Sequence, residues 1–84
     1  MKAWYVYILR CKEGTLYTGS TDDVERRVAV HNSGKGAKYT RGRRPVTLVY
    51  SEELENCSAA LKREYAIKQL SRREKWNLIN DQGG

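Results

Sequence analysis

The feature that most constrains this chain is a run of seven apolar residues, Ala3–Leu9, close to its start. The run is rich in β-branched and aromatic side chains and is followed by polar residues and by Gly14. An apolar run of this length with such boundaries is typical of a buried strand. A membrane-spanning helix would need about 20 apolar residues, so the run predicts a strand and no membrane span.

Two further segments have the character of strands. Leu16–Gly19 follows the first strand at hairpin distance, with Gly14 available for the turn. Val46–Tyr50, opened by Pro45, is again rich in β-branched residues. Three strands form a minimal sheet, which needs helices to cover it.

Three helices are expected around this sheet. The first begins at Asp22, which forms a capping box with Glu25, and ends at Asn32–Gly34. The second runs from Ser58 to about Leu70, and the third starts at another capping box, Ser71–Glu74. The order β-β-α-β-α-α predicts a small α/β (α+β) fold in which a three-stranded antiparallel sheet is flanked by three helices.

Length and cysteine content fit a small cytoplasmic protein. The 84 residues suit one domain, which we expect over residues 1–84 with an ordered core at about 3–80. Cys11 and Cys57 are too few for a disulfide framework and lack metal-ligand spacing, so we expect reduced thiols. No signal-peptide pattern precedes the first strand.

The balance of charges narrows the class of partner. The chain has 16 basic and 10 acidic residues, for a net charge of +6. This excess favours an anionic partner, either nucleic acid or an acidic membrane surface, although a basic surface that only keeps the protein soluble would give the same balance. A membrane-surface protein is disfavoured because the sequence has no basic amphipathic anchor.

Charged residues interrupt the apolar faces of two predicted helices. On the first helix, Arg27 and His31 lie on the same face as two valines. In a projection down the axis of the second helix, Glu64 lies between Ala60 and Leu61. A carboxylate in an apolar arc costs free energy unless a cation, a metal or a hydrogen-bond donor meets it. Glu64 is therefore either half of a structural ion pair with Arg27 or part of a functional site.

The aromatic residues are unusual, because the chain has six tyrosines and no phenylalanine. Where packing alone matters, phenylalanine serves without a hydroxyl that needs a partner. Tyr5, Tyr50 and Tyr65 are expected to be core tyrosines with satisfied hydroxyls. Tyr7 and Tyr17 can share a site only if they emerge on one face of the sheet, which a two-residue turn would prevent. We therefore predict an odd-length loop or a bulge in the hairpin between Leu9 and Leu16.

The tripeptides Tyr5–Tyr7 and Tyr17–Gly19 resemble, in order and spacing, the paired motifs of the GIY-YIG endonuclease superfamily. Arg27 stands where that family places its arginine, and His31 matches the histidine that many members carry one turn later. Glu64 looks like the metal-binding glutamate of the family.

The resemblance extends from about Trp4 to Ile79. The segment Gly36–Pro45 is similar to the loop of the small stand-alone bacterial members, the uncharacterised UPF0213-like subfamily. Two positions differ from the family pattern: Thr18 replaces isoleucine, which is a benign β-branched change, and Tyr5 replaces glycine and is expected to crowd the backbone. Larger members attach separate DNA-binding domains, which bears on affinity and specificity more than on chemistry.

The resemblance implies hydrolysis of a phosphodiester with one divalent metal, Mg²⁺ or Mn²⁺. Magnesium keeps most of its waters and often takes one or two carboxylates, so Glu64 alone suffices. Arg27 would donate to phosphate oxygens, or pair with Glu64 in the metal-free protein. Tyr7 would orient or deprotonate the attacking water, which requires nearby positive charge because a free phenol has a pKa of about 10. Tyr17 would position water or phosphate, and His31 would share the proton transfer, bond a phosphate oxygen or be structural.

The segment from Gly34 to Pro45 combines glycines with basic residues. Such a segment suits contact with a phosphate backbone, with Tyr39 stacking on a base and Thr40 bonding a phosphate, although many charged runs are only solvated loops. The residues that we assign to nucleic-acid binding are Lys35, Lys38, Tyr39, Thr40, Arg41, Arg43 and Arg44.

These features favour a metal-dependent endonuclease acting on DNA in preference to RNA, with DNA repair or recombination as the candidate process. The other hypothesis is a non-catalytic or weakly active nucleic-acid-binding module within a larger complex. Tyr7, Tyr17, Arg27 and Glu64 together favour the enzyme, because binding alone does not require an inward carboxylate. A protein partner that supplies specificity fits either hypothesis.

Overall fold

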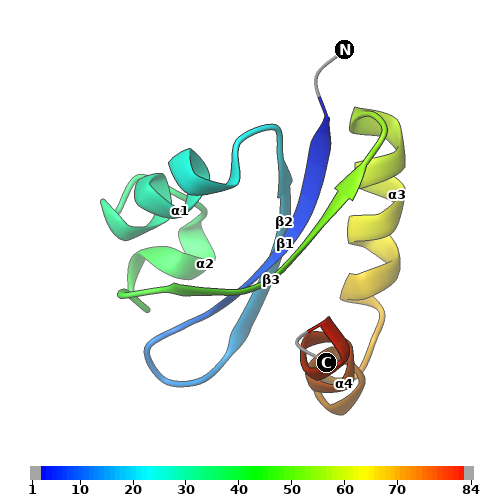
Figure 1. Cartoon of the computed structure of the whole chain (residues 1–84). Helices are drawn as coiled ribbons and strands as arrows, with labels where there is room; N and C mark the ends of the chain where they lie inside the picture. Colours follow the sequence, from blue (N-terminus) through cyan, green and yellow to red (C-terminus); the bar gives the residue numbers. More distant parts are fainter. Residues whose placement is uncertain (1–2, 83–84) are drawn as a thin grey trace.

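The computed structural model describes residues 3–82, which form one antiparallel sheet with helices on both of its faces (Figure 1). The strands, in the spatial order β2-β1-β3, are β1 (Trp4–Arg10), β2 (Leu16–Thr21) and β3 (Thr47–Leu54). The helices are α1 (Val24–Asn32), α2 (Lys38–Arg41), α3 (Cys57–Lys68) and α4 (Arg72–Gln82). The predicted fold class and element order are confirmed, with the four-residue α2 as an addition inside the basic segment.

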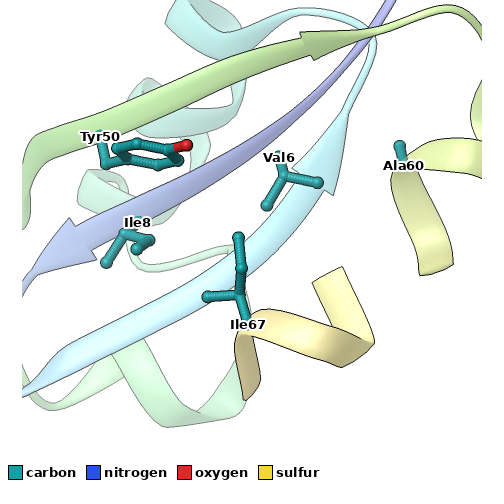
Figure 2. Packing of buried hydrophobic residues seen from close by; sticks show 5 residues of the cluster. All are labelled: Val6, Ile8, Tyr50, Ala60 and Ile67. Carbon is teal, nitrogen blue, oxygen red and sulfur yellow. The ribbon is translucent and has the colours of Figure 1, made fainter. Parts of the chain in front are cut away.

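The central strand β1 is buried on both faces, so its alternating side chains contribute to two clusters. One cluster lies between the sheet and α3 and consists of Val6, Ile8, Tyr50, Ala60 and Ile67 (Figure 2). The other lies on the face covered by α1 and α2 and consists of Tyr7, Leu9, Cys11 and Val46. The alternation therefore places Tyr7 on the α1 side of the sheet.

The hairpin loop determines the face on which Tyr17 emerges. Arg10 pairs with Leu16, which leaves the five residues 11–15 in the loop. Because this number is odd, Tyr17 projects from β2 on the same face as Tyr7 projects from β1. The prediction of an odd-length loop is confirmed.

Helix starts differ from the predicted ones by a single residue. Asp23 is the N-cap of α1, where Asp22 was expected, and its carboxylate accepts a hydrogen bond from the Arg26 backbone N–H at 3.1 Å. Asn56 caps α3 in the same way, so that helix begins one residue before Ser58.

The capping box of α4 is confirmed in both directions. The Glu74 backbone N–H donates to the Ser71 hydroxyl at 3.1 Å, and the Ser71 N–H donates to the Glu74 carboxylate at 2.9 Å. None of the helices in residues 3–82 combines the length and the apolar character needed to cross a membrane.

Three tyrosines outside the candidate site have different environments. Tyr50 is buried and donates to a Glu52 oxygen, as expected of a core tyrosine. The expectation for Tyr65 is wrong, because this side chain is 68% exposed on α3. Tyr5, expected to crowd the backbone, is accommodated in regular pairing with Thr21 of β2 and with Glu53 near the end of β3, and its side chain is half-buried and lies outside the buried core.

Candidate active site

Tyr7 and His31 form the buried centre of the candidate site. The hydroxyl of Tyr7, on β1, lies 3.0 Å from Nε2 of His31, on α1. The two residues are 1% and 0% exposed. Both predicted residues are thus brought into direct contact, in a position shielded from solvent.

The close approach of Tyr7 to the edge strand β2 depends on Gly19. A Cβ atom at position 19 would lie 2.5 Å from the Tyr7 hydroxyl oxygen and 3.2 Å from the ring of Tyr17. No real side chain tolerates the first of these distances, so glycine at this position makes room for the phenol. Local packing therefore explains the glycine of the tripeptide Tyr17–Gly19.

Burial and neighbouring charges both act on this pair. Burial raises the pKa of Tyr7, and this effect outweighs the opposing hydrogen bond and charge of Arg27. Burial, with a smaller contribution from the Arg27 charge, lowers the pKa of His31. Both shifts favour the uncharged forms, a phenol beside a neutral imidazole, in the protein without a bound metal.

Tyr17 lies among three other rings. Its centroid is 6.5 Å from that of Tyr7, 5.2 Å from that of His31 and 5.8 Å from that of Tyr39. The planes of Tyr17 and Tyr39 differ by 27°, so these two rings are stacked. Tyr17 thus connects the buried pair to the partly exposed Tyr39.

Glu64 approaches from the opposite face of the sheet, on α3. Its side chain is 17% exposed, accepts a hydrogen bond from the Ser20 hydroxyl at 2.6 Å and pairs with Lys68 at 2.7 Å. Its negative charge contributes to raising the pKa of Tyr7, so the two groups are electrostatically coupled. The carboxylate is mostly buried, as predicted.

The ion pair between Glu64 and Arg27, one of the two alternatives that the sequence left open, is not formed among the residues that the structure describes. Lys68, four residues later on the same helix, takes that role. Arg27 is half-buried and lines a pocket of about 210 Å³ at the start of α1, beside Asp22 and Asp23. The guanidinium is therefore accessible from solvent and also reaches Tyr7.

These groups surround the edge strand β2. Gly19 lies against Tyr7 on one face, and the next residue, Ser20, bonds Glu64 on the other face. Successive residues of a strand point to opposite faces, so one dipeptide serves both halves of the site. Sequence reasoning missed Ser20, although the alternation along β2 directs it toward the helix that carries Glu64.

The basic segment is partly ordered by contacts with the site. Tyr39 is 38% exposed, and the Arg43 guanidinium lies 4.1 Å from the centre of its ring. Arg43 also donates to the Tyr39 carbonyl at 2.8 Å and pairs with Glu13 at 3.6 Å. The exposed basic side chains of the segment are Lys35, Lys38, Arg41 and Arg44.

Thr40 requires a correction. It was expected to contact a phosphate, but it is 0% exposed and its hydroxyl lies 2.7 Å from Nδ1 of His31. The short helix α2 turns Tyr39 outward and Thr40 inward, so Thr40 belongs to the interior of the site.

The donor groups near Glu64 fit a hard divalent cation. Residues 3–82 contain no cluster of three or more histidine, cysteine or acidic side chains that would hold a metal by protein ligands alone. Magnesium keeps several waters and is often bound through one or two carboxylates, so a single carboxylate beside the Ser20 hydroxyl is compatible with it.

Comparison with known proteins agrees with this fold. The profile of the GIY-YIG catalytic domain matches residues 3–78, so the chain belongs to the GIY-YIG family, a family of nuclease-type catalytic domains. Within that family it is similar to the UPF0213 proteins. The UPF0213 protein of Halobacterium salinarum is 61% identical over 75 residues, covering 89% of this chain and 97% of the relative. That of Natronomonas pharaonis is 58% identical over 80 residues, covering 95% and 94%.

A solved structure gives the same result. The solution NMR structure of a UPF0213 protein from Bacillus halodurans has 52% sequence identity to this chain and a TM-score of 0.63. The similarity covers 98% of this chain and 87% of that protein. Fold and family are therefore supported by sequence and structure together.

Proposed function

We propose that this protein is a metal-dependent endonuclease that hydrolyses phosphodiester bonds of nucleic acid, with DNA favoured over RNA. The observation that carries the proposal is the grouping of Tyr7, His31, Arg27 and Glu64 around the edge of β2. A hydrogen-bonded phenol and imidazole, a guanidinium and a mostly buried carboxylate are the groups that metal-assisted hydrolysis of a phosphate ester needs.

Each side chain has a definite role in this proposal. Tyr7 accepts a proton from the attacking water as its own phenol proton passes to Nε2 of His31, which is 3.0 Å away. Arg27 donates to the phosphate oxygens as negative charge develops there. Tyr17 positions the water or the phosphate.

Glu64 is the proposed ligand of Mg²⁺ or Mn²⁺, with Ser20 orienting the carboxylate. A metal bound there would polarise a phosphate oxygen and stabilise the leaving oxygen. The ion pair with Lys68 has to open for the carboxylate to become available.

The basic segment supplies binding. Lys35, Lys38, Arg41 and Arg44 are exposed cations suited to phosphates. Tyr39 is 38% exposed, is stacked on Tyr17 and has Arg43 over its ring, so this group of side chains is available to an unpaired base. Unpaired bases occur in branched and damaged DNA, which fits a cytoplasmic role in DNA repair or recombination with a partner protein supplying specificity.

A cleavage assay tests this proposal. Labelled single-stranded, duplex and branched DNA, and RNA, are incubated with the protein and Mg²⁺, and we expect cleavage of at least one DNA substrate. Glu64→Gln keeps the shape and loses the charge, so it should reduce the rate by at least about 100-fold. Cleavage at the wild-type rate by this variant would remove Glu64 from the metal site.

A nucleic-acid-binding module is the second candidate function. The observation in its favour is that Lys68 and Ser20 already satisfy both oxygens of Glu64. Binding to the same DNA substrates without cleavage under any metal condition would select this alternative.

A further inference from the structure

Thr40 holds a position that the basic character of its segment does not explain. It is fully buried in α2, with its hydroxyl oxygen 2.7 Å from Nδ1 of His31 and 2.9 Å from the carbonyl oxygen of Ala37. The other ring nitrogen of His31 faces the Tyr7 hydroxyl. A continuous chain of hydrogen bonds therefore runs from Tyr7 through His31 and Thr40 to the backbone of residue 37.

The protons in this chain can be arranged in two ways. In the first, Tyr7 donates to Nε2, Nδ1–H donates to Thr40, and the Thr40 hydroxyl donates to the Ala37 carbonyl, which can only accept. All three protons then have an acceptor, and all three hydrogen bonds are made.

The second arrangement reverses the imidazole. Nε2–H would donate to Tyr7, and Thr40 would donate to Nδ1, so the bond from Thr40 to the carbonyl of residue 37 would be lost. The phenol proton of Tyr7 would also need a new acceptor, while the neighbouring Arg27 offers only donors. A buried donor without an acceptor is costly, so the first arrangement is the stable one.

The surrounding chain keeps the ring in this orientation. A Cβ atom at position 36 would collide with Nδ1 of His31 and lie 2.8 Å from its Cα and Cγ atoms, so Gly36 packs directly against the ring. Gly36 and Thr40 thus enclose His31 from the same short segment, and the Ala37 carbonyl lies between them in sequence.

We propose that Thr40 is a positioning residue that fixes His31 as the Nδ1–H tautomer and so leaves Nε2 free to receive the phenol proton of Tyr7. The assignment of the tautomer stands on geometry alone, whereas its catalytic consequence rests on the proposed nuclease function. Thr40 acts through His31 and does not touch the substrate.

Nitrogen-15 NMR of the imidazole ring tests the tautomer directly. His31 is the only histidine in the chain, so both ring nitrogens are assigned without ambiguity. At neutral pH we expect Nδ1 to carry the proton and Nε2 to be unprotonated. A predominant Nε2–H form in the wild-type protein would overturn the proposal.

Variants separate the influence of Thr40 from that of Tyr7. Thr40→Val keeps the shape and removes the acceptor, so the population should shift toward Nε2–H, whereas Thr40→Ser should retain Nδ1–H. Tyr7→Phe removes the other partner and should also retain Nδ1–H, because Thr40 still accepts from that nitrogen. A switch to Nε2–H in Tyr7→Phe, or an unchanged tautomer in folded Thr40→Val, would show that Thr40 does not set the tautomer.

Cleavage measurements test the consequence. The rate constant of Thr40→Val at saturating substrate should fall about 100-fold, with Thr40→Ser close to wild type and the affinity for DNA unchanged in both. Thr40→Val cleaving at the wild-type rate with its tautomer reversed would overturn the catalytic part. If the wild-type protein cleaves nothing, the nuclease proposal fails, while the NMR result still decides the role of Thr40.

Discussion

The carboxylate of Glu64 is balanced by Lys68, four residues further along α3. The lysine side chain is 47% exposed, and such helical pairs contribute only about 0.3–0.5 kcal/mol. A divalent ion with its stronger field can therefore displace the ammonium at small cost. The pair thus holds Glu64 in place and can open at small cost for the proposed metal.

Removing this competitor should strengthen metal binding. Lys68→Met keeps the aliphatic stem and loses the charge, so the affinity for Mn²⁺ measured by calorimetry should rise about two-fold. Lys62→Met, at an exposed position of the same helix, is the matched control and should leave the affinity unchanged. Weaker binding by Lys68→Met would mean that the lysine supports the metal.

A second residue-scale prediction concerns Thr18, which replaces the isoleucine of the family pattern. Its side chain is 4% exposed, and its hydroxyl oxygen finds no hydrogen-bond partner among residues 3–82. Burying a hydroxyl without a partner costs free energy, so Thr18→Val should raise the free energy of unfolding in urea by about 1 kcal/mol.

Thr21 provides the control for this experiment. It lies on the same strand and is also buried, but its hydroxyl accepts from the Asp23 N–H at 3.1 Å and donates to the Asp23 carbonyl at 3.3 Å. Thr21→Val should therefore lower the free energy of unfolding. If Thr18→Val lowered the free energy of unfolding as much as Thr21→Val does, the hydroxyl of Thr18 would have a partner.

At the scale of elements, α2 is the link between the surface and the interior. Its four residues make little more than one turn, too few to show a helical repeat of apolar residues in the sequence. Side-chain contacts hold it, because Thr40 bonds His31 and Tyr39 stacks on Tyr17. Adjacent residues of α2 thus connect a proposed binding surface with the proposed proton path. Two of its residues, Lys38 and Arg41, remain exposed on the outside.

If α2 presents these cations to nucleic acid, their removal should change the salt dependence of binding. Each phosphate contact contributes about 0.7–0.9 to the slope of log K against log salt concentration. The double change Lys38→Ala with Arg41→Ala should weaken binding and reduce that slope by between one and two, measured by fluorescence anisotropy. Lys62→Ala is the control, and an unchanged slope in the double variant would place α2 outside the footprint.

At the scale of the whole molecule, the local part of the fold was predictable. Continuous apolar and β-branched runs predicted the strands, and a capping box predicted the start of α4. The requirement that Tyr7 and Tyr17 emerge on one face predicted the odd length of the hairpin loop. Spacing also indicated that Glu64 points inward. These features depend on residues close together in the sequence.

The remaining features depend on contacts between distant segments. The bond from Ser20 to Glu64 joins residues 44 positions apart, and the inward turn of Thr40 exists only because His31 is there to receive it. The basic composition of the segment around Thr40 led to the prediction that Thr40, like its basic neighbours, contacts nucleic acid at the surface. Composition does not reveal which side chain of a short helix turns inward, so this residue was misassigned.

At this scale the buried pair of Tyr7 and His31 also contributes to the pH dependence of stability. Burial lowers the pKa of His31 below its ordinary 6.5, so the unfolded chain takes up a proton before the folded protein does. The contribution of His31 to stability is therefore complete above about pH 6.5 and is lost as the pH falls below it. Burial raises the pKa of Tyr7 above its ordinary 10, so that contribution is present below about pH 10 and is lost as the pH rises through the folded-state value.

Urea denaturation across this range measures the decline of the free energy of unfolding on both the acid and the alkaline side. Between about pH 5 and 7, where most carboxylates stay ionised, the decline on the acid side should become flatter in His31→Gln than in the wild-type protein. On the alkaline side Tyr7→Phe should remove only part of the decline, because burial and Glu52 also raise the pKa of Tyr50. An acid limb of wild-type steepness in His31→Gln would mean that another group accounts for it, and that His31 is less enclosed than its contacts with Tyr7 and Thr40 imply.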